Sequence, residues 1–394
     1  MAELIQKRRR RSAAAEQIEN RDRTKENEPE EYVGPDPKKI TEDRLIPSGS
    51  TLVNCACSDN PKGAFALGSI NTIPGKSASG KTVLMLTMLA CCAVDPKFKE
   101  YEFIYDDGEQ SLSFDLDYLF PPLAPKDPED LTSGRLKAPN YDDGEPVPSE
   151  TIQDFKGNIL IKCKQRRPFI WVLDSLDSLT SDEEMEREYK NAIKNAKSAE
   201  AVTELKGSYK AEKAKHIGEA LRMINGNIKR TDSALFIIQQ TRQRFKSGFG
   251  QTDWVTSGGD APFFYSFHQL YLNSIKSITE EAMNLKHKIG SMAQIEVIKN
   301  KLTGKKRKSG VVIPIYESYG LHDVESCIDF LKLTEHWASD TKGIVAKEFD
   351  IKKSKDNLIE YIEDNNLQDK LQDIVGSVWK EVEKMLMFKT PRRF

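Results

Sequence analysis

The segment Gly75-Lys-Ser-Ala-Ser-Gly80-Lys81-Thr82 constrains the fold of this chain more than any other. It has the spacing GxxxxGKT, follows an apolar run at 69–74, and opens an apolar stretch at 80–94. A strand, a glycine-rich turn and a helix in this order predict a phosphate-binding loop, because backbone N–H groups and the helix N-terminus then face an anion. We expect ATP and Mg²⁺ as ligands, and the candidate residues are Gly75, Ser79, Gly80, Lys81 and Thr82.

Short apolar runs alternate with helical stretches through the middle of the chain. Strands are expected at 69–74, 102–105, 169–173, 234–238, 269–272, 294–298 and 311–316, and helices at 80–94 and 211–229. Strands alternating with helices predict an α/β fold with a mostly parallel central sheet that is covered on both faces.

Composition divides the chain into three parts. We expect a flexible charged arm at 1–45, the ATPase core at 46–331 and a small helical domain at 332–394. Within the core, 121–148 reads as a surface insertion and 181–212 as an exposed charged segment. The 59 Lys and Arg nearly balance the 61 Asp and Glu, so a polyanion site has to be local.

The location of the protein is expected to be cytoplasmic and away from membranes. The longest uncharged apolar run has 13 residues, at 82–94, whereas a spanning helix needs about 20. The basic cluster near the first residue has no apolar stretch after it, so no secretory signal is expected. The six cysteines show no zinc spacing and are expected to be reduced thiols.

Acidic residues end two of the expected strands. Asp174 follows an apolar run and would stand beside the phosphate loop, where a carboxylate can hold Mg²⁺. Asp106, Asp107 and Glu109 follow another strand, and one carboxylate of this group is expected to polarise the attacking water in ATP hydrolysis. The residues alone leave open which of them does so.

Polar amides end a third strand, and a loop with cations and aromatic rings follows. Gln240 could hydrogen-bond the γ-phosphate and lose that bond on hydrolysis, as a nucleotide sensor does. The loop at 243–262 combines charges and rings that suit single-stranded DNA. The candidate DNA-binding residues in and beside it are Arg242, Arg244, Lys246, Phe249, Trp254, Gly258 and Gly259.

A basic stretch comes near the end of the core. Lys299 and Lys301 flank one residue on an expected strand, so their side chains should point to the same face and approach one polyanion together. The cations at 305–308 are expected to form a hairpin turn that faces solvent.

Taken in order, these segments resemble a RecA-type recombinase. The resemblance covers about 46–388 and includes the leading segment Pro47-Ser-Gly-Ser-Thr-Leu, the phosphate loop and Asp174-Ser175. It continues through Ile238-Gln-Gln-Thr-Arg, Thr256-Ser-Gly-Gly-Asp-Ala-Pro-Phe-Phe-Tyr-Ser, Ile298-Lys-Asn-Lys-Leu and the helical end with Trp337. The glutamine, the GGDA loop and the KNK strand together are specific to this family.

The resemblance implies an ATP-dependent recombinase that forms a filament on single-stranded DNA and pairs it with a homologous duplex. It implies that 181–212 is the first DNA-binding loop, that Glu109 is the base unless Asp107 aligns instead, and that Lys299 and Lys301 reach the ATP of the adjacent subunit. Phe114 or Tyr118 would replace the family's adenine-stacking tyrosine. Mediator or single-strand-binding proteins are candidate partners, and the divergence suits a bacteriophage-encoded protein acting in the host cytoplasm.

Two other functions share this core. A hexameric DNA helicase would translocate and unwind, and an ATP-gated scaffold would coat single-stranded DNA without useful turnover.

Overall fold

A large α/β sheet organises the structure. The computed structural model describes residues 40–127, 130–197, 209–245, 252–256 and 258–386. The sheet has the order β14-β13-β12-β11-β3-β9-β8-β4-β5, with β10 paired to β9. Every pair from β11 to β5 is parallel, whereas β11 to β14 and β9 with β10 are antiparallel. The α/β fold with a parallel central sheet is confirmed.

The strands of this sheet lie close to the expected positions, and several are longer. Their bounds are β3 Ser69–Gly75, β4 Glu102–Asp107, β5 Leu136–Lys137, β8 Phe169–Asp174, β9 Ala234–Phe245, β10 Thr252–Thr256, β11 His268–Ala282, β12 Leu285–Asn300, β13 Arg307–Tyr316 and β14 Gly320–Leu321.

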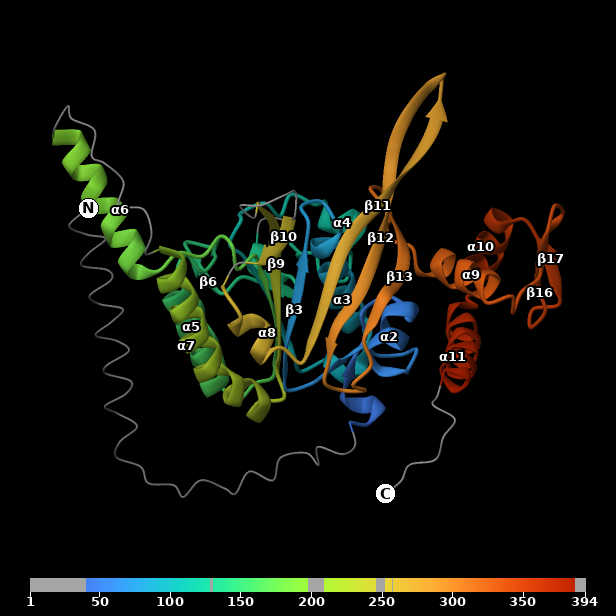
Figure 1. Ribbon diagram of the computed structural model, residues 1–394, viewed down its shortest axis with the longest axis horizontal. Coiled ribbons are helices and arrows are strands. Elements are labelled where there is room, and N and C mark those ends of the chain that lie inside the picture. The colour runs from blue at the N-terminus through green and yellow to red at the C-terminus, as the bar shows by residue number, and fades with distance from the viewer. Residues whose placement is uncertain (1–39, 128–129, 198–208, 246–251, 257, 387–394) are drawn as a thin grey trace. The chain divides into compact units, whose positions relative to one another are not determined.

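Helices cover both faces of the sheet (Figure 1). One face carries α2 (Thr51–Ser58) and α3 (Lys81–Val94), and the other carries α5 (Ile152–Lys164) and α7 (Tyr209–Arg230). Alternate residues of β8 supply the two hydrophobic cores, because successive side chains of a strand point to opposite faces. Ile170 and Val172 pack in the first core, and Trp171 and Leu173 in the second. None of the described helices is long and apolar enough to cross a membrane.

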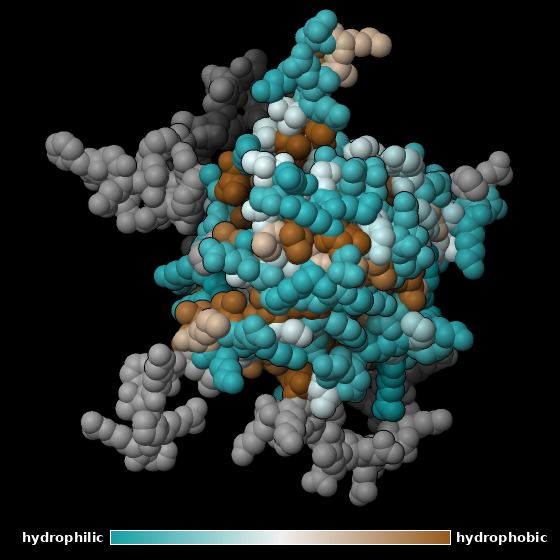
Figure 2. Space-filling model, turned by 90° about the vertical axis from the view of Figure 1, so that its right-hand side faces the viewer, coloured by the Kyte–Doolittle hydropathy of each residue, from teal (hydrophilic) through white to brown (hydrophobic). Residues whose placement is uncertain are grey.

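The hairpin of β11 and β12 extends beyond the core (Figure 1). Its ladder continues to the pair Ala282 and Leu285, well past the expected strands at 269–272 and 294–298. The outer half is largely polar, so its sequence lacks the apolar alternation that predicts a strand. Figure 2 shows this hairpin at the top of the molecule, largely hydrophilic along its sides and with hydrophobic residues at its tip. Backbone pairing rather than side-chain burial therefore forms the outer half.

The segments predicted to be irregular contain structure of their own. In the arm, residues 1–39 lie outside the described residues. The short helix η2 (Glu42–Arg44) leads into β1 (Leu45–Ile46), which is buried and paired to β2 (Phe65–Ala66). The insertion at 121–148 contains η4 (Leu131–Ser133), β5, β6 (Asn140–Asp142) and β7 (Glu145–Val147), and the charged segment at 181–212 contains the helix α6 (Asp182–Lys197). The short elements η3 (Pro96–Phe98) and α4 (Leu116–Leu119) precede the insertion. The insertion thus adds an edge strand, β5, to the central sheet.

The carboxyl-terminal segment is not purely helical, contrary to the expectation. After α9 (Asp323–Leu333), which crosses the expected boundary at 331, it contains α10 (Lys355–Asp364), α11 (Gln368–Met385) and a three-stranded sheet of β15 (Ser339–Asp340), β16 (Gly343–Ala346) and β17 (Ile351–Lys353). These strands have two to four residues each, too few to show a period in the sequence.

The basic turn at 305–308 does not simply face solvent, so that expectation was wrong for Lys305 and Arg307. Lys305 Nζ donates to Asp59 Oδ2 at 2.6 Å and to Glu383 Oε2 at 2.7 Å. Arg307 also pairs with Glu383 and lies over the ring of Trp379, with 5.8 Å between the guanidinium carbon and the ring centroid. The tertiary fold brings α11 to this turn, and sequence spacing gives no sign of that contact.

We predict that Glu383→Ala lowers the free energy of unfolding by roughly 1–2 kcal/mol, because Lys305 and Arg307 lose a shared, mostly buried acceptor while solvent screens part of the loss. Urea unfolding measures the change, and Glu381→Ala on the exposed side of α11 is the matched control. Equal stability of both variants would mean that the ion pairs do not hold α11.

Candidate nucleotide-binding site

The glycine-rich segment connects the central strand β3 to α3, as the sequence predicts. Gly80 is the residue before α3 and has φ +88°, a conformation that favours glycine. A Cβ on Gly80 would also stand 2.4 Å from Cδ1 of Ile315. The turn therefore requires glycine at this position, and it directs the first N–H groups of α3 toward the carboxyl edge of the sheet.

Lys81 is folded back onto the loop. Its Nζ donates to the carbonyl oxygens of Lys76 at 2.6 Å and Gly75 at 3.3 Å. Burial lowers the pKa of Lys81, and the nearby charges of Asp174, Glu109 and Asp177 oppose that shift. The charged oxygens of a polyphosphate would accept stronger hydrogen bonds from this buried ammonium group than the carbonyl oxygens do.

Asp174 ends β8 beside this loop. Its Oδ2 accepts hydrogen bonds from Thr82 Oγ1 and from the hydroxyl of Tyr105, both at 2.7 Å. Burial raises the pKa of Asp174, although the two hydroxyl groups oppose the rise. The structure thus places Thr82 and Asp174 together, as two oxygen donors of the kind that Mg²⁺ prefers.

The loop fits a phosphate ligand. Ser79 Oγ is buried and has no hydrogen-bond partner among the described residues. A buried hydroxyl without a partner costs free energy, so a ligand that accepts from it would be stabilised. This orphaned hydroxyl, the lysine and the helix N-terminus all belong to one short turn.

Glu109 and Asp107 differ in what their carboxylates contact. Asp107 accepts main-chain N–H groups of Ser111 at 3.2 Å and Leu112 at 2.8 Å, so it holds the turn after β4. Glu109 is exposed, and its Oε1 accepts from Ser175 Oγ at 2.5 Å and from Gln240 Nε2 at 2.8 Å. The geometry favours Glu109 over Asp107 as the carboxylate available to a water molecule.

Gln240 lies on β9, opposite Gly75 in the ladder with β3. Its side chain therefore starts beside the phosphate loop and reaches Glu109. The same strand continues to Phe245 and pairs with β10, with Arg244 opposite Asp253 and Arg242 opposite Val255. Part of the segment at 243–262, which was expected to be a loop, is thus paired strand that extends β9.

The candidate DNA-binding residues are placed as follows. Arg242 and Arg244 lie on β9 and Trp254 lies on β10, while Lys246 and Phe249 lie outside the described residues. Gly258 and Gly259 precede α8 (Ala261–Tyr265), and both have positive φ. Gly258 stands close to Ile217 of α7, so this turn packs against the covering helix.

Lys299 lies next to the last residue of β12 and contacts α8, whereas Lys301 directly follows the strand. Lys299 Nζ donates to the carbonyl oxygens of Phe263 and of Phe264, the latter at 3.0 Å, and lies 4.6 Å from the ring centroid of Phe263. Burial, and then the neighbouring charge of Lys301, lower the pKa of Lys299 to about 8. The charge of Lys301 acts on Lys299, so the two cations lie near each other.

Sequence reasoning missed Tyr105 and Asp177, and it grouped Asp106 with the candidate catalytic acids although Asp106 is buried. Tyr105 lies inside an apolar strand, and its hydroxyl contact with Asp174 depends on the pairing of β4 with β8. Asp106 is buried and accepts from the N–H and Oγ of Ser149, both at 2.7 Å. Asp177 accepts from the main-chain N–H of Gln240 at 2.8 Å. The run of acids at the end of β4 was the one sequence signal near these residues, and it pointed to Asp106 alone.

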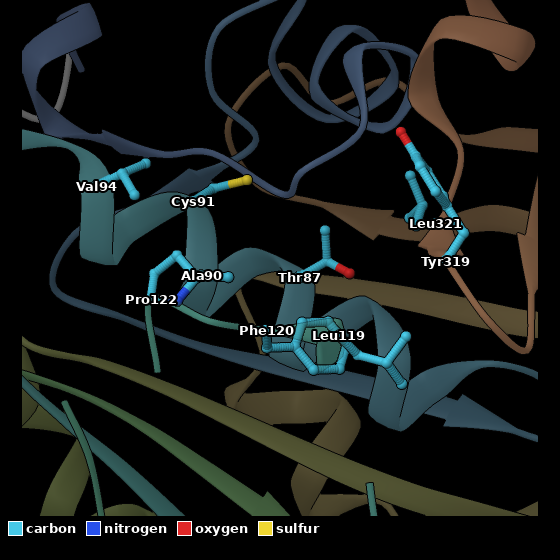
Figure 3. Close-up of a pocket in the computed structure, with 9 residues that line it drawn as sticks. All are labelled: Thr87, Ala90, Cys91, Val94, Leu119, Phe120, Pro122, Tyr319 and Leu321. Carbon is cyan, nitrogen blue, oxygen red and sulfur yellow. The ribbon is translucent and has the colours of Figure 1, made fainter. Parts of the chain in front are cut away.

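An apolar cavity of about 250 Å³ opens beside α3 (Figure 3). It is lined by Thr87, Ala90, Cys91, Val94, Leu119, Phe120, Pro122, Tyr319 and Leu321. Its lining includes neither the phosphate loop nor the acids near it. Phe114 and Tyr118, the candidate adenine contacts, do not line it and are exposed.

Comparison with known proteins gives a consistent result. The model of the RecA N-terminal domain matches residues 170–320, which run from β8 to β14. The chain is similar to RecA proteins. It is 28% identical to Protein RecA of Xylella fastidiosa over 261 residues, which cover 65% of this chain and 62% of that protein. It is 27% identical to Protein RecA of Xanthomonas euvesicatoria over 262 residues, which cover 66% of this chain and 62% of that protein.

These matches support a RecA-type family for the chain. The matched part spans about three fifths of the length of each RecA protein. The RecA-domain match begins at β8, after the phosphate loop, so the geometry around Lys81 is an observation separate from that match.

Lys81 and Glu109 should serve different steps. We predict that Lys81→Ala loses nucleotide binding, whereas Glu109→Gln still binds ATP but hydrolyses it at least 100-fold more slowly, a typical loss for a general base. Nucleotide binding and single-turnover hydrolysis, measured side by side, test this. Normal hydrolysis by Glu109→Gln together with slow hydrolysis by Asp107→Asn would assign the base to Asp107.

Asp106 should give stability a distinctive pH dependence. Burial raises the pKa of the Asp106 carboxyl from 3.8 to about 6. The protonated side chain therefore adds its full contribution to the free energy of unfolding below pH 3.8, and this contribution is lost as the pH rises through 6. We predict that Asp106→Asn, which keeps an oxygen acceptor, gains about 3 kcal/mol relative to the natural chain between pH 4 and pH 7. Denaturant unfolding at several pH values measures this, and parallel profiles would contradict it.

Proposed function

We propose that the chain is an ATP-dependent DNA recombinase that assembles on single-stranded DNA and pairs it with a homologous duplex. One observation carries the proposal: Gln240 Nε2 donates to the carboxylate of Glu109 from the strand that continues into the β9–β10 hairpin. A residue in this position can sense the nucleotide and move the hairpin. The RecA-type matches support the same reading.

ATP is the proposed substrate, with Mg²⁺ as its cofactor. The N–H groups of the loop, Ser79 Oγ and Lys81 Nζ would bind the phosphates, and Thr82 and Asp174 would hold the cation. Mg²⁺, when bound, neutralises charge on the phosphate oxygens. Because Thr82 and Asp174 already contact each other, little reorganisation is needed to bind it.

Hydrolysis is proposed to depend on Glu109. Its exposed carboxylate stands at the carboxyl edge of the sheet and is oriented by Ser175 and Gln240. It would accept a proton from water that attacks the γ-phosphate. When Gln240 contacts the γ-phosphate, it has to leave Glu109, so one bond is exchanged for another as the nucleotide changes.

Single-stranded DNA is proposed to bind near β9, β10 and the Gly258-Gly259 turn. Cations of this region would contact phosphates, and rings would stack on bases. Duplex DNA, other copies of the chain, and mediator or single-strand-binding proteins are the further proposed partners, and the proposed location is the cytoplasm, that of the host if the protein comes from a bacteriophage.

A hexameric helicase is the rival function with the same core. A strand-displacement assay distinguishes the helicase from a recombinase. Steady-state phosphate release, measured with and without single-stranded DNA, distinguishes a recombinase from a passive scaffold. Imaging with DNA and a nonhydrolysable ATP analogue gives an open helical filament for the recombinase and a closed ring for the helicase.

The shared-site part of the proposal concerns Lys299 and Lys301. We predict that the double variant Lys299→Ala, Lys301→Ala is nearly inactive alone because a neighbour's ATP loses its two cations. Mixed with Lys81→Ala protein, it should recover DNA-dependent turnover, since mixed interfaces join an intact phosphate loop to intact lysines. Steady-state ATPase over a range of mixing ratios measures this. No recovery, with joint assembly on DNA confirmed, would assign the lysines to a role within their own subunit.

A further inference from the structure

Asp177 joins three elements at the edge of the candidate site. It lies three residues beyond Asp174, in the turn that follows β8. Its Oδ2 accepts the main-chain N–H of Gln240 on β9 at 2.8 Å, and its main-chain carbonyl accepts Lys213 Nζ of α7 at 3.1 Å. One residue therefore contacts the sensor strand and the helix that follows the segment at 181–208.

The carboxylate continues the pairing of β8 with β9 after the ladder ends. The last ladder pair is Leu173 with Ile237, and Leu176 N–H then donates to the carbonyl of Ile238. At the next step a side chain, that of Asp177, takes the place of a backbone carbonyl and accepts from Gln240. A charged acceptor makes a stronger bond than a carbonyl does, so the backbone of Gln240 is held firmly.

Holding this backbone determines where the side chain of Gln240 points. The amide reaches Glu109 Oε1 at 2.8 Å from a residue whose N–H is fixed by Asp177 and whose strand neighbour is Gly75. The charge of Asp177 also acts on Lys81, whose pKa it helps to raise against burial. Asp177 is thus in electrostatic contact with the phosphate loop while it holds the sensor.

We propose that Asp177 is the positioning residue that makes Gln240 report the nucleotide to the candidate DNA-binding segments. It acts through Gln240 and does not touch the reacting atoms. The inference rests on the proposed function, since it concerns the coupling between the ATP and DNA sites. It predicts that coupling depends on a hydrogen-bond acceptor at position 177 more than on its charge.

Three variants test the inference. Asp177→Ala removes the acceptor, Asp177→Asn keeps an oxygen acceptor without the charge, and Asp182→Ala makes the same charge change at the exposed start of α6. For each, the affinity for a labelled single-stranded oligonucleotide is measured with ADP and with a nonhydrolysable ATP analogue at one salt concentration. The ratio of the two affinities is the coupling between the sites.

We expect the ratio to fall about tenfold in Asp177→Ala, the effect of losing one hydrogen bond to a charged group. It should stay within about threefold of the natural chain in Asp177→Asn and be unchanged in Asp182→Ala. Binding of the ATP analogue in the absence of DNA should change far less than the ratio in all three. A merely structural role would lower stability and nucleotide binding together.

The inference would be overturned if the affinity ratio of Asp177→Ala equalled that of the natural chain. It would also be overturned if Asp177→Ala and Asp177→Asn lowered the ratio equally. If Asp177→Ala does not fold, Asp177→Ser is measured in its place, since its hydroxyl is too short to reach Gln240, and the same outcomes apply. If the natural chain itself binds DNA equally with both nucleotides, the proposed function fails first. That result is distinct from a loss confined to the Asp177 variants.

Discussion

The buried carboxylate of Asp174 holds the candidate site together. It accepts one hydroxyl from Thr82 of α3 and one from Tyr105 of β4, so three elements meet at a single group. Burying a carboxylate is costly, and the two hydrogen bonds offset part of that cost. The loop, its lysine and the neighbouring acids therefore lie close together at the carboxyl edge of the sheet.

The position of β9 in the sheet explains how such a site could act on DNA. It lies between β3, which leads into the phosphate loop, and β8, which carries Asp174. Its register places Gln240 beside Gly75, and its last residues form the hairpin with β10. A change at the γ-phosphate would therefore reach the hairpin through one continuous strand. Close packing on both sides makes a change of hydrogen-bond partner more plausible than bending of the strand.

Strong local signals explain which features could be predicted from the sequence. The phosphate loop has a fixed spacing, and buried strands such as β8 are continuous apolar runs, so both were placed nearly to the residue. The main-chain bonds that distinguish Asp107 from Glu109 belong to the turn after β4, and no spacing in the sequence reveals them. The contacts of Lys305 and of Asp177 join residues distant in sequence, and no periodicity reveals them. The outer hairpin of β11 and β12 was missed because its side chains are largely exposed and polar.

The proposed coupling of the two ligands depends most on the exchange of Gln240 between Glu109 and the nucleotide. A high-resolution structure of the chain assembled on single-stranded DNA with Mg²⁺ and a nonhydrolysable ATP analogue tests it most directly. If Gln240 exchanges partners, its amide lies within hydrogen-bond distance of the γ-phosphate in that structure and no longer contacts Glu109. A nucleotide bound at the loop, with the Gln240 and Glu109 bond intact, would contradict it.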